Sequence, residues 1–397
     1  MITECVLGAS ALFLYNNRDK LNIRLKWNKI CKSKSTFTNN LEKTLKIWSI
    51  RRAGYGYIIR MELPYSYTRE DLEKDLDVFR EGLKFKSIQL RQEGNIVDMY
   101  CIKNYKFKDY KPLYLPGNEL LIGDGLTEPI VVDMNKFPHM LIGGSTGSGK
   151  SRILLLIITN LIKHCNNVVI HLLQIRKNDL GVFANCKQVK SNSKTLEEVR
   201  DTLKSIDKEC FRREKLIDNT KGYYNIEDYN KVAYYKLRYV YVVIEEFSFL
   251  NASRGDNNHD KKIKNECLKY VKNIINVGRS SGVFLITALQ KPTNDSIPSD
   301  IKAQLCTRVS LRIEDSPAAI VIMGDASPTK LGERELICKT LGTQQGYSYT
   351  IGHDIIMENI KDKIIKKENK EENTIVVLEE SKENNVRSIL DKLNAIN

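Results

Sequence analysis

Short apolar stretches alternate with longer amphipathic ones through the middle of the chain. The apolar stretches have the length of buried strands, and the amphipathic ones have helical periodicity. The expected strands cover residues 139–142, 168–174, 239–245 and 283–288, and the expected helices cover 152–164, 195–218 and 260–276. This alternation predicts an α/β fold, in which a mostly parallel sheet is covered by helices on both faces.

A smaller α+β pattern precedes this region. The expected elements are two strands within 47–63, around Gly54 and Gly56, a helix that begins after a capping box at Thr68 and Asp71, and strands near 87–92 and 96–102. Four apolar residues of the helix recur at helical spacing, which marks them as core: Leu72, Leu76, Phe79 and Leu83.

The chain has 397 residues, which is too long for one compact core. We expect an N-terminal basic arm or helix at 1–45, the small α+β domain at 46–117, the α/β domain at 118–354 and a charged tail at 355–397. Within the tail, residues 374–378 form one short apolar stretch that is typical of a strand.

The chain is strongly basic, with 63 Lys and Arg against 49 Asp and Glu and a net charge of +14. Such a charge favours a polyanionic partner, either nucleic acid or an anionic membrane surface, although it also serves solubility. Basic residues dominate 18–52, where Asp19 and Glu42 are the acidic ones. This segment is either an arm that faces a membrane or nucleic acid, or the solvated face of a helix.

Nine cysteines are scattered without a C-x-x-C pair, a pattern typical of a reduced cytosolic protein without a zinc site. The apolar opening at residues 2–15 contains Glu4 and is shorter than the roughly 20 residues that cross a bilayer. We therefore expect no transmembrane helix. Without a basic start or cleavage site, a secretory signal is not expected either.

Residues 144–151 read Gly-Ser-Thr-Gly-Ser-Gly-Lys-Ser and match the G-x-x-x-x-G-K-[ST] phosphate-binding loop. An expected strand leads in and an expected helix leads out, which is the context that such a loop requires. Lys150 would neutralise the β- and γ-phosphates of a nucleoside triphosphate, and the Ser151 hydroxyl would bind Mg²⁺. The backbone N–H groups that would face the phosphates belong to Gly144, Ser145, Thr146, Gly147, Ser148 and Gly149.

Two adjacent carboxylates follow the apolar stretch 239–244. At the end of a buried strand, Glu245 would hold the magnesium shell and Glu246 would orient the attacking water. Gln290 follows the next expected strand, where it would sense the γ-phosphate or simply cap a turn. Arg279 and Arg308 lie on either side of that strand, and each is a candidate arginine finger across a subunit boundary or an ordinary surface ion-pair partner.

Residues 123–151 resemble the motor core of the FtsK/SpoIIIE family of DNA translocases. Residues 211–214 and 225–230 resemble the family's segment before its acidic strand, and the likeness covers roughly 115–350. The module before it resembles the family's pre-motor domain. Glu245 stands where the family usually has aspartate. Gln290 falls at the family's Thr-Gln-Arg-Pro sensor, but Leu289 and Lys291 replace the usual threonine and arginine.

The resemblance implies a RecA-like motor that assembles as a hexameric ring around DNA and advances by hydrolysing ATP with Mg²⁺. The multi-span anchor and winged helix of chromosomal translocases are not evident, so the chain looks more like the coupling ATPases of conjugative elements. The expected partners are DNA, further copies of the chain and a transfer-channel or relaxase protein. The expected location is the cytoplasm or the inner face of the membrane.

Two alternatives remain for the function. One is a chromosome-partitioning pump, and the other is a nucleotide-gated scaffold ATPase of a secretion or transfer apparatus. A P-loop kinase or small-molecule enzyme fits poorly, because no acceptor-substrate site can be identified in the sequence.

Overall fold

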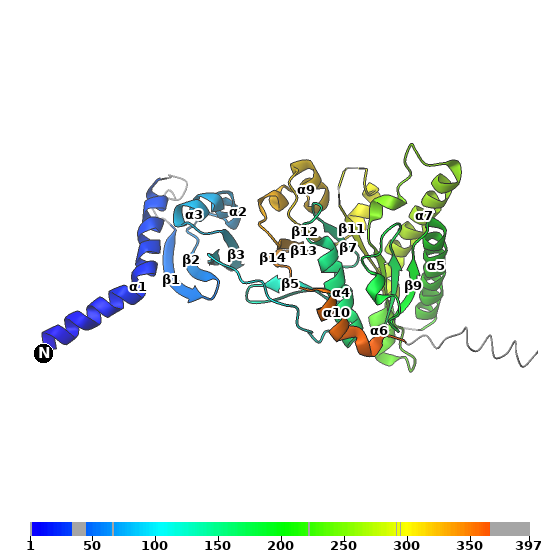
Figure 1. The fold of residues 1–397 in the computed structure, drawn as a ribbon, viewed down its shortest axis with the longest axis horizontal. Coiled ribbons are helices and arrows are strands. Elements are labelled where there is room, and N and C mark those ends of the chain that lie inside the picture. The colour runs from blue at the N-terminus through cyan, green and yellow to red at the C-terminus, as the bar shows by residue number, and fades with distance from the viewer. Residues whose placement is uncertain are drawn as a thin grey trace, which may run out of the picture. The chain divides into compact units, whose positions relative to one another are not determined.

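A computed structural model describes residues 2–33, 45–65, 67–220, 223–290, 292–293 and 295–365. It divides the chain into two compact units, Met1–Lys108 and Asp109–Asn397 (Figure 1). The predicted strand at 374–378 and most of the predicted tail lie outside the described residues. Among the described residues, no helix is long and apolar enough to cross a membrane.

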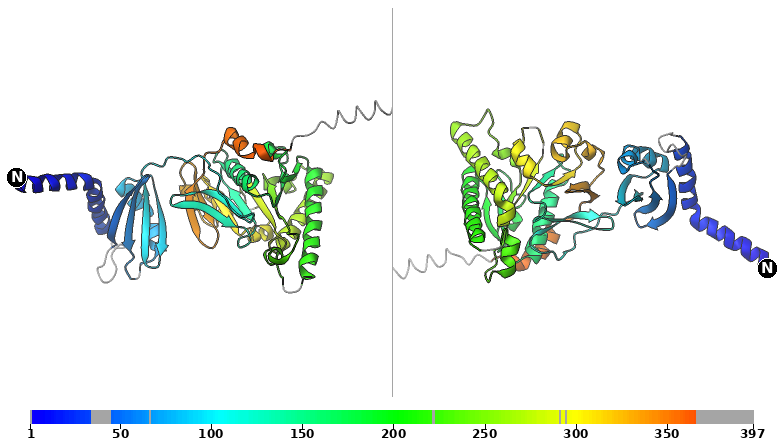
Figure 2. Two further views of the ribbon diagram at one scale, coloured as in Figure 1. Left: turned by 90° about the horizontal axis from the view of Figure 1, so that it is seen from below. Right: turned by 180° about the vertical axis from the view of Figure 1, so that it is seen from behind.

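The first unit is a four-stranded antiparallel sheet in the order β1-β2-β4-β3, with helices packed on one face (Figure 2). The strands are β1 (Lys46–Ala53), β2 (Gly56–Glu62), β3 (Ser87–Glu93) and β4 (Ile96–Ile102), and the helices are α1 (Ile2–Ser33), α2 (Arg69–Lys74) and α3 (Leu76–Leu83). Trp27 of α1 packs on Phe79 of α3, and its indole N–H donates to the Leu45 carbonyl oxygen over 2.7 Å. These contacts join the helices and the sheet in one core.

The helix expected after Thr68 is two helices, so the expectation of a single helix was wrong. The capping box of Thr68 and Asp71 is present at the start of α2. At Asp75 the backbone leaves the helical region, with φ −100° and ψ 3°, and α3 begins at the next residue. The helical spacing continues across the break, which explains why the sequence pattern reads as one helix.

Helix α1 packs on the sheet through one side. Ile23, Trp27 and Ile30 are buried against the sheet. Several basic residues on the other side of the helix are exposed, namely Arg18, Arg24, Lys29 and Lys32. This stretch is therefore a packed helix with an exposed basic side, which suits either interpretation of the basic segment.

The second unit contains a ten-stranded sheet. In sheet order its strands are β6 (Glu128–Asp133), β5 (Glu119–Gly125), β14 (Thr343–Tyr347), β13 (Glu335–Lys339), β12 (Thr307–Leu311), β7 (Met140–Gly143), β11 (Val283–Leu289), β10 (Tyr239–Ile244), β8 (Val168–Leu173) and β9 (Val189–Ser193). Neighbours from β12 to β9 are parallel, and those from β6 to β12 are antiparallel. The mostly parallel α/β sheet that the sequence predicts is confirmed by the fold.

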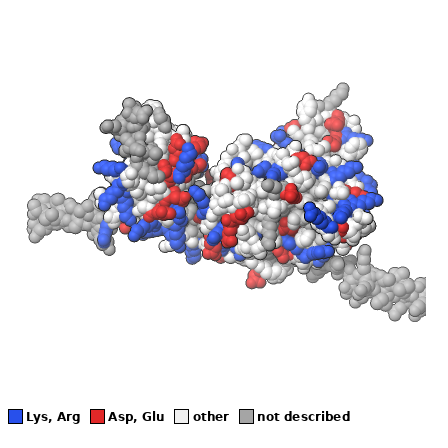
Figure 3. Space-filling model, turned by 90° about the horizontal axis from the view of Figure 1, so that it is seen from above, with Lys and Arg blue, Asp and Glu red and all other residues white. Residues whose placement is uncertain are grey.

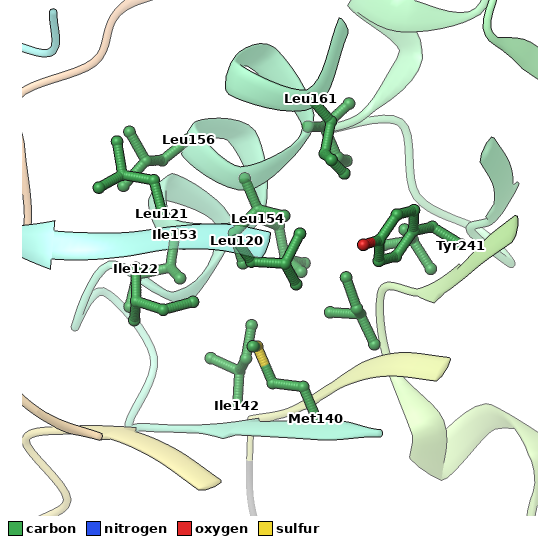
Figure 4. Packing of buried hydrophobic residues seen from close by; sticks show 14 of the residues in the cluster. Leu120, Leu121, Ile122, Met140, Ile142, Ile153, Leu154, Leu156, Leu161 and Tyr241 are labelled. Atoms are coloured by element: carbon green, nitrogen blue, oxygen red, sulfur yellow. The ribbon is translucent and has the colours of Figure 1, made fainter. Parts of the chain in front are cut away.

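Helices cover both faces of this sheet, as predicted. On one face α4 (Lys150–His164) and α10 (His353–Ile360) pack into a large apolar cluster, part of which Figure 4 shows between α4, β5 and β7. On the other face α5 (Leu196–Asp218) and α7 (Asn258–Ser281) share a second cluster. The shorter helices are α6 (Ile226–Val232), α8 (Ser299–Gln304) and α9 (Ser316–Met323). The inner parallel strands β7, β11, β10 and β8 are therefore buried on both sides, which explains their almost wholly apolar sequences.

The stretch expected to open a charged tail at residue 355 instead continues α10. Ile356 and Ile360 are buried in the cluster beneath α4, although charged residues surround them in the sequence. The structure also adds strands that the sequence pattern did not indicate, on both edges of the predicted sheet: β5, β6, β9, β12, β13 and β14.

The segment from residue 109 to 117 is bound to the second unit, which places the division ahead of the predicted boundary at 118. The Asn160 side chain of α4 accepts a hydrogen bond from the Leu113 N–H and donates one to the Leu113 carbonyl oxygen, each over 3.0 Å. Tyr241, fully buried on β10, donates its hydroxyl to the Gly117 carbonyl oxygen over 2.7 Å. This segment thus belongs to the α/β fold.

Candidate nucleotide site

Residues 144–149 form the turn between β7 and α4, where the phosphate-binding loop was predicted. Gly147 and Gly149 have φ of 79° and 109°, a region that other residues rarely adopt. A Cβ atom on Gly144 would lie 2.4 Å from the Ser148 hydroxyl oxygen, so the Ser148 side chain would have to rotate away. The backbone of the turn therefore requires glycine at positions 147 and 149.

Lys150 and Ser151 begin α4 and contact groups around the loop. The Lys150 ammonium group donates to the carbonyl oxygens of Gly144 and Ser145. Burial lowers the pKa of Lys150 to about 8, with Glu246 opposing the shift and Lys177 adding to it. The Ser151 hydroxyl donates to the Asp179 carboxylate over 3.0 Å. The structure therefore brings the loop lysine into the electrostatic reach of Glu246, 96 positions further along the numbering.

The strand order places the acidic residues beside the loop. β11 lies between β7 and β10, and all three are parallel, so their carboxyl ends meet at one edge of the sheet. Glu245 and Glu246 follow β10, and Gln290 follows β11. The Gln290 backbone N–H lies 3.5 Å from a carboxylate oxygen of Glu246, which also accepts a hydrogen bond from the Ser248 hydroxyl over 2.9 Å. Lys291 lies outside the described residues.

Glu245 is a buried carboxyl group in an unusual environment. Burial raises its pKa to about 7, the nearby Asp179 charge adds to the shift, and Lys177 opposes it. Within the described residues, both of its oxygens and Oε2 of Glu246 are buried without a hydrogen-bond partner. The Ser148 hydroxyl of the loop is also buried without a hydrogen-bond partner among the described residues. Buried polar atoms of this kind normally have partners.

These unpaired atoms fit a magnesium-bound triphosphate. Carboxylate and hydroxyl oxygens are the ligands that Mg²⁺ prefers, and it usually binds few protein groups together with phosphates. The described residues contain no group of three or more His, Cys, Asp or Glu that could hold a metal ion. Ser151 and Glu245 would hold the cation, and the loop with Lys150 would hold the phosphates.

The two arginine candidates do not contact the phosphate-binding loop in their own chain. Arg279 lies in the last turn of α7 at the opposite edge of the sheet, where it donates to the Asn135 carbonyl oxygen over 3.1 Å. Arg308 lies opposite Leu141 in the β12–β7 pairing, and its guanidinium faces the carbonyl oxygens of Ile322 and Lys302 at 3.3 Å. Both guanidinium groups thus bind main-chain carbonyl oxygens in their own chain.

Lys177 and Asp179 belong to the site but were not predicted. They lie in the loop after β8, the strand on the far side of β10 from β11. The signal in the sequence was a polar run, Gln174 to Asp179, directly after an apolar strand. This polar stretch could be assigned to the site only once β8 was seen to be adjacent to β10.

The loop, the acidic strand end and the sheet order define a RecA-like P-loop ATPase fold. A family model described as FtsK/SpoIIIE family matches residues 114–316, just over half of the chain. The chain belongs to the FtsK/SpoIIIE family.

Curated relatives match at moderate identity. The DNA translocase FtsK of Oceanobacillus iheyensis is 26% identical over 257 residues, which cover 61% of this chain and 31% of the relative. The DNA translocase SpoIIIE of Bacillus subtilis is 26% identical over 249 residues, which cover 58% of this chain and 30% of the relative. The Ftsk domain-containing protein YdcQ of the same organism is 25% identical over 367 residues, which cover 88% of this chain and 72% of the relative. The chain thus spans about a third of the length of these translocases.

Two solved structures share the fold. The pCW3 conjugation coupling protein TcpA, solved with ATPγS, has a TM-score of 0.62 and 21% identity, and the match covers 87% of this chain and 99% of that one. The cytoplasmic domain of the type VII secretion ATPase EccC of Thermomonospora curvata has a TM-score of 0.53 and 19% identity. The match covers 65% of this chain and 32% of that one.

Proposed function

We propose that this chain is an ATP-hydrolysing DNA translocase that moves DNA during the conjugative transfer of a mobile element. One observation carries the proposal: within an FtsK/SpoIIIE domain, the phosphate-binding loop, Glu245, Glu246 and Gln290 converge on one edge of the sheet. A triphosphate needs this combination of cation, metal ligand, base and sensor for hydrolysis.

Each residue has a role that its position permits. Lys150 would exchange its loop carbonyl partners for the β- and γ-phosphates, and Ser151 and Glu245 would hold the magnesium ion, which supplies charge compensation when bound. Glu246 would orient water, held in place by the Ser248 hydroxyl. Gln290, whose backbone reaches Glu246, would report the state of the γ-phosphate. Arg279 or Arg308 would act on a neighbouring subunit's nucleotide, after leaving its carbonyl partners.

One comparison supports conjugative transfer over chromosome partitioning. The likeness to TcpA, a conjugation coupling protein, extends over almost the whole of that chain. The partners that follow are DNA, further copies of this chain in a hexamer, and a transfer-channel or relaxase protein at the inner face of the membrane.

The net charge of +14 agrees with a DNA substrate but does not locate the DNA contact. On the face of the second unit seen in Figure 3, basic and acidic side chains are interspersed. Phosphate contacts release condensed counterions, so DNA binding should weaken steeply as salt rises.

ATP turnover with and without DNA tests the proposal. We expect duplex or single-stranded DNA to stimulate hydrolysis by the wild-type protein, with the stimulation lost at moderate salt. Lys150→Ala should lower the rate on the order of 10²–10³-fold, because transition-state charge is no longer compensated. Lys262→Ala, an exposed position on α7, is the control and should behave like the wild type.

Hydrolysis that is unaffected by Lys150→Ala would remove the basis of the proposal. Nucleotide-dependent assembly without any stimulation by DNA would favour the second candidate, a scaffold ATPase of a secretion apparatus. The fold shared with EccC is the observation that supports this second candidate. Particle imaging in the same samples gives the number of subunits.

A further inference from the structure

Among the described residues, Lys177 forms ion pairs with both carboxylates at the end of β10. Its ammonium nitrogen lies 3.8 Å from Oε1 of Glu245 and 3.8 Å from Oε2 of Glu246. The Lys177 side chain is 20% exposed, whereas those of Glu245 and Glu246 are 1% and 7% exposed. A single cation is thus placed between two buried carboxylates.

The contacts of Lys177 are electrostatic and loose. Both distances exceed hydrogen-bond range, and these same carboxylate oxygens are buried without hydrogen-bond partners in the described part of the chain. Two adjacent buried carboxylates without a countercharge would be strongly destabilising. Lys177 therefore compensates their charge without occupying their hydrogen-bonding capacity, which stays available to another ligand.

The other charged groups around the pair strengthen this view. Asp179 lies next to Glu245 and accepts the Ser151 hydroxyl, and Lys150 lies in the field of Glu246 but donates to loop carbonyls. Among the described groups, three carboxylates stand against two ammonium groups, so additional positive charge can be accommodated. A divalent cation held by Ser151 and Glu245 would come to the same carboxylate that Lys177 faces.

The backbone that carries Lys177 is fixed at both ends, so only the side chain needs to move. The Lys177 N–H donates to the Gln174 carbonyl oxygen over 3.2 Å, and the Leu180 N–H donates to the Gln174 side-chain oxygen over 3.2 Å. Gln174 is itself buried at 1% exposure. A flexible four-carbon stem on a fixed loop can withdraw an ammonium group without rearranging the fold.

We propose that Lys177 is an internal counter-ion of Glu245 and Glu246 and competes with the divalent cation for these carboxylates. When metal and nucleotide bind, the Lys177 ammonium group moves away from the carboxylates. It is a positioning residue, and it lowers the affinity of the site for a divalent cation that arrives without a nucleotide. The inference rests on the proposed nucleotide site, but not on DNA as the substrate.

Metal binding in the absence of nucleotide tests the competition on the full chain. Mn²⁺ affinity is measured by calorimetry or by paramagnetic resonance for the wild type, Lys177→Met and Lys177→Arg. Lys177→Met should bind Mn²⁺ about 5–100-fold more tightly, the range of a typical coupling free energy between competing ligands. Lys177→Arg keeps the charge and should stay near the wild type. Lys187→Met, an exposed lysine just beyond the same loop, is the matched control.

Thermal unfolding gives a second readout. Without divalent cations, Lys177→Met should unfold at a lower temperature than the wild type, and millimolar Mg²⁺ should restore more stability to the variant than to the wild type. Mn²⁺ binding to Lys177→Met that is equal to or weaker than wild-type binding would overturn the proposal, because a purely structural lysine does not compete with metal.

A measurement on the wild type covers the case in which Lys177→Met does not fold. Amine-reactive labelling, followed by mass spectrometry, reports how accessible each lysine is. Mg²⁺ with ADP should raise the labelling of Lys177 relative to Lys187, because the ammonium group has left the carboxylates. Unchanged labelling would contradict the exchange. Metal binding, thermal unfolding and labelling need neither DNA nor ATP turnover. Failure of the Lys177 proposal is therefore separable from failure of the translocase proposal.

Discussion

At the residue scale, Glu245 shows how the site trades stability for function. Its folded pKa of about 7 lies above the ordinary value of 4.5, so the folded state prefers the protonated form. The resulting destabilisation is absent below about pH 4.5 and fully present above about pH 7. A metal site needs an ionised carboxylate in a buried place. Keeping Glu245 ionised there lowers the free energy of unfolding.

Replacement of Glu245 by glutamine should therefore stabilise the protein in a pH-dependent way. At pH 8 we expect Glu245→Gln to raise the free energy of unfolding on the order of 2 kcal/mol in metal-free buffer. At pH 5 the gain should shrink, because the wild-type carboxyl group is already largely protonated. Denaturant unfolding at the two pH values measures the difference. Glu358→Gln, exposed on α10, serves as the control, and a gain at Glu245 that does not change with pH would refute the argument.

At the element scale, the sequence predicted the elements that are buried on both faces and missed those at the edges. The strands β7, β8, β10 and β11 are continuous apolar runs, which periodicity and length identify without tertiary information. β9 reads Val-Lys-Ser-Asn-Ser and is a strand only because it pairs with β8. Edge strands are determined by their partners more than by their own residues.

The candidate site divides in the same way. The loop at 144–151 and the Glu245 and Glu246 pair were predicted because each has a local signature after an apolar strand. Lys177 and Asp179 also follow an apolar strand, but their stretch matches no recognised motif, and they reach the site because β8 is the neighbour of β10. Strand order is a property of the whole sheet, which a single sequence does not display.

Helix α10 offers a test of an element that sequence reasoning assigned to a tail. Ile356 is 2% exposed in the cluster beneath α4, so Ile356→Ala should leave a cavity and lower the free energy of unfolding by about 2–4 kcal/mol. Glu358→Ala on the exposed side of the same helix should change it little. Denaturant unfolding compares the two, and equal effects would mean that α10 contributes no core.

At the scale of the whole molecule, the division into two units predicts separable folding. Each unit has its own apolar core, one around Trp27 and Phe79 and the other on the two faces of the large sheet. A fragment that begins at Asp109 should fold and bind ATP as the full chain does. Circular dichroism and a fluorescent nucleotide analogue measure this. A fragment that starts at residue 118 is the informative contrast, because it lacks the segment bound to Asn160 and should be less stable.

The hydrogen bonds of Asn160 have a mechanical consequence. Asn160 belongs to the helix whose first residue is Lys150, and its side chain holds Leu113 by both main-chain groups. The Tyr110 hydroxyl donates a hydrogen bond to the same amide oxygen over 3.0 Å. A shift of this helix along its axis would therefore also move the main chain at Leu113, because one side chain ties the two together.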